Sequence, residues 1–96
     1  MTPASYAMFW WMDGGARRAG RIEFGDDFVS LAATTPHPAE EERIRFRDLA
    51  SVLLDRGLLH LERGGMPSIH IGSLDTPGAL RELADRLSDS AHAATA

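Results

Sequence analysis

Two histidines are the residues of this chain whose type and spacing most directly suggest metal chemistry. His60 and His70 lie in two short alternating segments separated by a glycine-rich turn. If these segments pair with their apolar residues on one face, the imidazoles lie opposite each other, with Cβ atoms about 5 Å apart. Such a pair can chelate a metal ion, with Glu62 as a third ligand on the same face. Two histidines alone leave a site incomplete, and chance neighbours on a polar face are the simpler interpretation, so no metal or cofactor is expected.

A second group that could bind a ligand is the arginine cluster of residues 14–21. Arg17, Arg18 and Arg21 follow two glycines, and guanidinium groups match the geometry of phosphate oxygens. The alternative is a hairpin loop whose charges are only solvated. The net charge of −4 argues against general binding of nucleic acid or anionic membranes, because both need a basic field.

Motifs of catalysis are missing from the sequence. It contains no nucleophile elbow, zinc-protease helix, P-loop or dinucleotide fingerprint. Acidic residues gather at 26–27 and 40–42, in an expected turn and an expected loop, and His37 stands between two prolines with no evident base or nucleophile nearby. We therefore expect a protein that is not an enzyme.

The elements that must position these residues are predicted to be seven short strands. Apolar alternation and turn residues place them at 6–12, 20–24, 28–33, 43–47, 48–54, 58–63 and 67–72. Segment 34–42, with two prolines and three acids, is expected to be a surface loop. In segment 43–47, Ile44 and Phe46 face inward and the three arginines outward.

Burial of the apolar residues specifies the register of the last hairpin. Leu61 opposite Ile69 and Leu59 opposite Ile71 keep the apolar faces together. This register places His60 opposite His70 and leaves 64–66 as a three-residue loop with a glycine in the left-handed conformation.

One helix is predicted to close the chain at 77–88. Thr76 is suited to the N-cap and Pro77 to the first helical position. An apolar stripe for packing on a sheet is formed by Leu80, Leu83, Ala84 and Leu87. Residues 89–96 lose the pattern and are expected to fray.

The first strand is apolar on both faces. Alternation places Tyr6, Met8, Trp10 and Met12 on one side and Ala7, Phe9 and Trp11 on the other. One face fills the core, so the other is either covered within the monomer or kept for an interface, and aromatic surface favours the interface. The candidate partner-binding residues are Phe9, Trp10 and Trp11, and the expected partner is a second copy of the chain or another protein.

Seven strands and one closing helix follow one another, with the most characteristic stretches at residues 20–27 (GRIEFGDD), 44–52 (IRFRDLASV), 58–63 (LLHLER) with 69–71, and 77–83 (PGALREL). This order resembles the pleckstrin-homology-like fold, in a bacterial form. The resemblance implies a half-open barrel of two sheets, with seven antiparallel strands and one C-terminal helix at one end. It also implies binding of proteins or of anionic lipid headgroups, the latter at Arg17, Arg18 and Arg21.

Composition sets the remaining expectations. The 96 residues are enough for one domain, and no apolar run reaches the length of a membrane span. Cysteine is absent, which fits a reducing cytoplasm, and all ten basic residues are arginine, a bias typical of GC-rich bacteria. The sequence predicts a cytoplasmic interaction module that forms a homodimer, with binding of anionic headgroups as the alternative.

Overall fold

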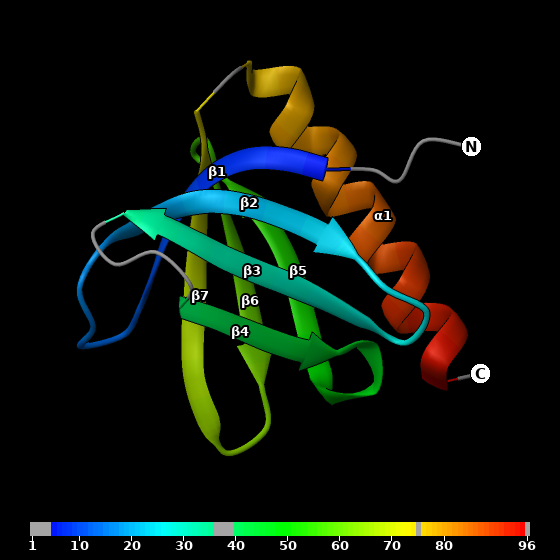
Figure 1. Ribbon diagram of the computed structural model, residues 1–96. Coiled ribbons are helices and arrows are strands. Elements are labelled where there is room, and N and C mark those ends of the chain that lie inside the picture. Colours follow the sequence, from blue (N-terminus) through cyan, green and yellow to red (C-terminus); the bar gives the residue numbers. More distant parts are fainter. Residues whose placement is uncertain (1–4, 36–39, 75, 96) are drawn as a thin grey trace.

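Seven antiparallel strands and one long helix make up the computed structural model, which describes residues 5–35, 40–74 and 76–95 (Figure 1). The predicted number of strands and the C-terminal helix are confirmed. The elements are β1 (Ser5–Met12), β2 (Arg18–Phe24), β3 (Phe28–Thr35), β4 (Glu40–Arg45), a 3₁₀ turn η1 (Phe46–Asp48), β5 (Leu49–Asp55), β6 (Leu58–Arg63), β7 (Met66–Ser73) and α1 (Pro77–Thr95).

The seven strands of the expected half-open barrel are joined in one open sheet rather than in two. Their order is β4-β3-β2-β1-β7-β6-β5, so β4 and β5 are the edges. The sheet is continuous because β1 pairs on both sides: Tyr6 lies opposite Ile22 of β2, and Trp10 lies opposite Ile71 of β7. Figure 1 shows that the sheet is curved and that α1 lies against its inner face.

The core lies between this inner face and α1. Met8, Ile22, Leu61 and Ile71 are fully buried there, and the predicted helix stripe of Leu80, Leu83, Ala84 and Leu87 packs against them. The Tyr6 hydroxyl donates a hydrogen bond to Glu82 of α1 at 3.1 Å, and burial of the ring raises the pKa of Tyr6. The first strand is therefore anchored to the helix at one end.

The helix continues well past the predicted end at residue 88. It runs from Pro77 to Thr95, so the described part of the expected frayed tail is helical. Alanine has the highest helix propensity, and Ala91 packs against the core, which supplies contacts that the apolar periodicity did not show. In the described part of the chain, no helix is both long and apolar enough to span a membrane.

Much of the expected loop 34–42 belongs to strands. β3 continues to Thr35 and β4 begins at Glu40, while residues 36–39, with His37, lie outside the described residues. Glu41 of β4 contacts the neighbouring strand, because the Ser30 hydroxyl donates a hydrogen bond to it at 2.6 Å. This bond, together with the charge of Arg43, lowers the pKa of Glu41. Acids that looked solvated in the sequence are thus part of the strand pairing.

Two other local predictions need correction. The expected strand 43–47 ends at Arg45, because residues 46–48 turn into η1, although Ile44 and Phe46 are buried as predicted. The turn between β6 and β7 has two residues rather than three, since Arg63 pairs with Met66 after a register shift beyond Leu61. Gly65 in this turn has a φ of 74°, the left-handed conformation that was expected of a glycine.

The close approach of β2 and β3 at Gly20 gives a test of this sheet. A Cβ at Gly20 would meet the main-chain oxygen of Ala32, which cannot rotate away. We expect Gly20→Ala to lower the free energy of unfolding by about 1–3 kcal/mol or more, measured by urea denaturation. Gly64→Ala is the control, because a Cβ there meets nothing within 4 Å. Equal stabilities of the two variants would contradict the β2–β3 pairing.

Candidate functional site

A straight row of side chains crosses four neighbouring strands on the face opposite α1. Trp11 of β1 pairs with His70 of β7, His70 pairs with His60 of β6, and His60 pairs with Leu53 of β5. We call Trp11, His70, His60 and Leu53 the outer-face row. Their neighbours along each strand, such as Trp10, Leu61 and Ile71, point into the core instead. The alternation of the strands therefore builds this row from residues far apart in sequence.

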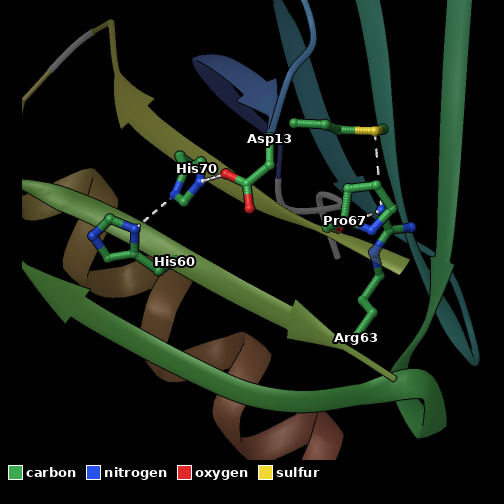
Figure 2. A network of polar contacts seen from close by, with 6 residues as sticks. Asp13, His60, Arg63, Pro67 and His70 are labelled. Atoms are coloured by element: carbon green, nitrogen blue, oxygen red, sulfur yellow. Dashed lines mark hydrogen bonds and ion pairs between the residues drawn. The ribbon is translucent and has the colours of Figure 1, made fainter. Parts of the chain in front are cut away.

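The two histidines are in direct contact, as the predicted register required. His60 and His70 are cross-strand partners, and their Nδ1 atoms are 2.8 Å apart (Figure 2). On the far side of the His70 ring, Nε2 lies 2.6 Å from an oxygen of Asp13, the residue that follows β1. Trp11 also contacts His70, with ring centroids 5.3 Å apart. His70 is thus the centre of a chain of polar contacts from Asp13 to His60.

This chain of contacts fixes where the protons lie when both rings are neutral. A carboxylate only accepts hydrogen bonds, so His70 must donate its Nε2–H to Asp13. Neutral His70 then has a bare Nδ1, and His60 must donate its own Nδ1–H to it. Asp13 therefore controls the tautomer of a histidine that it does not touch.

The aromatic end of the face is partly covered within the monomer. Phe9 and Trp11 stack with ring centroids 6.2 Å apart, and the Arg17 guanidinium lies 5.0 Å from each centroid. Phe9 also lies over Gly72, where a Cβ would collide with its ring. Both aromatic residues remain partly exposed. Trp10, proposed from the sequence as a third partner-binding residue, is only 2% exposed and belongs to the core, because the alternation of β1 turns it inward.

The structure does not bring the three candidate arginines together. Arg17 covers the outer-face aromatics, and Arg21 donates to the Ser5 hydroxyl at 2.6 Å. Arg18 is the β2 partner of Trp10 and lines a cleft with it on the inner side. With Arg18 on one face and the other two on the opposite face, a joint phosphate site has no support in their positions.

One arginine of interest, Arg63, was not singled out from the sequence. It lies on the inner side at the end of β6, with its side chain only 5% exposed. It donates to the Pro67 carbonyl oxygen at 3.0 Å (Figure 2) and contacts Glu42 of β4 at 3.3 Å. Its buried Nε has no hydrogen-bond partner among the described residues. The period-2 pattern Leu59, Leu61, Arg63 was the signal that placed it inward. Its contacts join edge strand β4 to the last hairpin.

Asp13 and Leu53 were also missed. Neither residue was assigned a role from the sequence. Neither has a local signal, since contact with His70 and His60 depends on pairing across the sheet. Glu62, suggested as a third metal ligand, does not join the histidines: among the described residues, no three His, Cys, Asp or Glu side chains converge on a common metal position.

Comparison with known proteins supports the fold alone. No protein-family model matches the chain, and no curated protein does. A solved structure that is similar is the crystal structure of the C-terminal domain of an unknown protein from Leishmania infantum. The TM-score is 0.69 at 13% identity, and the match covers 88% of this chain and 81% of the other. At this identity the likeness concerns the arrangement of strands and helix.

The tautomers of the histidine pair can be tested directly. We expect long-range ¹H–¹⁵N NMR spectra at a pH where the rings are neutral to show His60 protonated at Nδ1 and His70 at Nε2. Asp13→Ala removes the acceptor for Nε2–H and should abolish this preference in both rings, while Asp13→Asn keeps an acceptor oxygen and should preserve it in part. A His60 ring protonated at Nε2 in the unchanged protein would refute the arrangement.

Proposed function

We propose that this chain is a protein-interaction module that self-associates through its outer face. The observation that carries the proposal is the outer-face row, in which aromatic, imidazole and leucine side chains follow one another across β1, β7, β6 and β5. Leu53, at the β5 end of the row, is 56% exposed. At the β1 end, Trp11 and its stacking partner Phe9 are partly exposed. Surfaces rich in aromatic residues and poor in charged ones are typical of interface cores.

The polar groups of this face favour a protein partner over bulk water. Asp13, His70 and His60 already bond to one another, and these hydrogen bonds would offset part of the cost of removing the groups from water when the face is covered. The Arg17 guanidinium lies over two rings, 5.0 Å from each centroid, and arginine beside aromatic residues is common at binding interfaces. A second copy of the chain has the same outer-face row. A twofold axis along this row would place the same side chains of the two copies against each other.

Membership of the pleckstrin-homology-like group and a non-enzymatic, cytoplasmic role are part of the same proposal. The strand number and the C-terminal helix support the membership, and the lack of cysteine supports the location. The non-enzymatic role is proposed because the sequence contains no catalytic motif. Binding of anionic headgroups stays a prediction, and the positions of Arg17, Arg18 and Arg21 do not favour it.

A charge placed at the exposed end of the row should weaken self-association. We expect Leu53→Glu to raise the dimer dissociation constant by about tenfold or more, because the carboxylate would lose water at the interface. Sedimentation equilibrium in buffer with EDTA, across a wide concentration range, measures this. Met66→Glu is the matched control: Met66 is 54% exposed but stands beside the β6–β7 turn, outside the row.

Two results would contradict the proposal. One is an unchanged chain that stays monomeric at every concentration in EDTA. The other is a dimer that Leu53→Glu and Met66→Glu weaken equally, since the interface would then lie elsewhere. Circular dichroism and urea denaturation of each variant would show that a loss of association is not a loss of folding.

A further inference from the structure

The contact between His60 and His70 has a geometry that suits a metal ion as well as a proton. The facing atoms are both Nδ1, 2.8 Å apart, with the ring planes at 74° to each other. Asp13 binds the opposite nitrogen of His70, so Nδ1 is the atom that this ring has available for a ligand (Figure 2). Imidazole nitrogen is a preferred donor for zinc, copper and nickel.

We propose that these two Nδ1 atoms chelate one divalent transition-metal ion, and that the ion bridges two copies of the chain. Two nitrogens bound to one ion at about 2.0–2.1 Å are about 2.9–3.4 Å apart for bond angles between square and tetrahedral. The observed separation is 2.8 Å, and a small outward rotation of the two rings would widen it to this range. The χ2 torsion of histidine is soft enough to allow this turn. The metal takes the position of the proton that lies between the two nitrogens, and neutral His60 then carries its N–H at Nε2 instead of Nδ1.

Asp13 has the position of an outer-shell ligand partner. A histidine that binds a metal through one nitrogen usually donates its other N–H to a carboxylate, which fixes the ring and raises its basicity. The 2.6 Å contact between His70 Nε2 and Asp13 is already of this kind. It holds Nδ1 of His70 bare and aimed at His60.

A tetrahedral metal site needs four ligands, and His60 and His70 supply two of them. The described residues of one chain offer no third ligand, so the other two ligands come from elsewhere. The histidines stand in the middle of the face through which the chain is proposed to self-associate, so this step rests on that function. A twofold axis through the ion then supplies four imidazoles.

The test measures metal and mass together on the full chain. After EDTA treatment and removal of the chelator, ZnCl₂ is titrated in by calorimetry, and sedimentation equilibrium is repeated with and without ZnCl₂. We expect one zinc per two chains and a dimer tightened at least about tenfold by zinc. Co²⁺ in place of Zn²⁺ should give the visible absorption of a tetrahedral nitrogen site in the unchanged protein, which needs no variant to fold.

Variants assign the ligands. His60→Ala and His70→Ala should each abolish the zinc effect on mass, and Asp13→Asn should weaken zinc binding by about 10–100-fold. His92→Ala, which removes a histidine of α1, is the control and should change neither the stoichiometry nor the mass.

The outcomes separate this inference from the proposed function. A dimer in EDTA that binds no zinc, or that binds one zinc per chain without tightening, overturns the metal bridge and leaves self-association standing. A monomer in EDTA that zinc converts to a dimer, with His60 and His70 required, supports the bridge and contradicts only the metal-free association. A monomer in both conditions overturns both.

Discussion

Pairing of β1 on both of its edges is the constraint on which the rest of the structure depends. Its register with β2 and with β7 joins the first four strands to the last three in one sheet. The same pairing sends Met8 and Trp10 into the core and leaves Phe9 and Trp11 on the opposite face. A shift by one residue would reverse both sets, so burial of the core residues also fixes what the outer face presents.

The two faces of this sheet use polar groups in different ways. On the inner side, the Arg63 guanidinium is almost fully buried and is held by Glu42 and the Pro67 carbonyl oxygen. Such a group is costly to leave unpaired, so these contacts tie edge strand β4 to the last hairpin. On the outer side, Asp13, His70 and His60 are more accessible and form the chain of contacts at which we propose that a metal ion binds. The first arrangement is suited to stability and the second to binding.

All ten basic residues of the chain are arginine, and their side chains have several distinct roles. Arg17 covers two aromatic rings, Arg63 bridges strands from within, and Arg43 lies 4.9 Å from the Phe28 ring centroid while also contacting Glu41. Their planar guanidinium groups can stack and form hydrogen bonds at once, which a lysine ammonium cannot do. A cluster of arginines in the sequence was therefore a poor guide to a shared ligand.

The sequence by itself determined the elements and the face of most residues, because alternation in strands and the 3.6-residue period of the helix are local properties. It also determined that His60 and His70 are opposed, since only one register buries Leu59, Leu61, Ile69 and Ile71 together. Only the tertiary structure decided that Asp13 holds His70, that Leu53 extends the row, and that Arg17 covers Phe9 and Trp11. These contacts join strands that are distant in the chain. Their partners depend on strand order and curvature, which no local pattern of residues encodes.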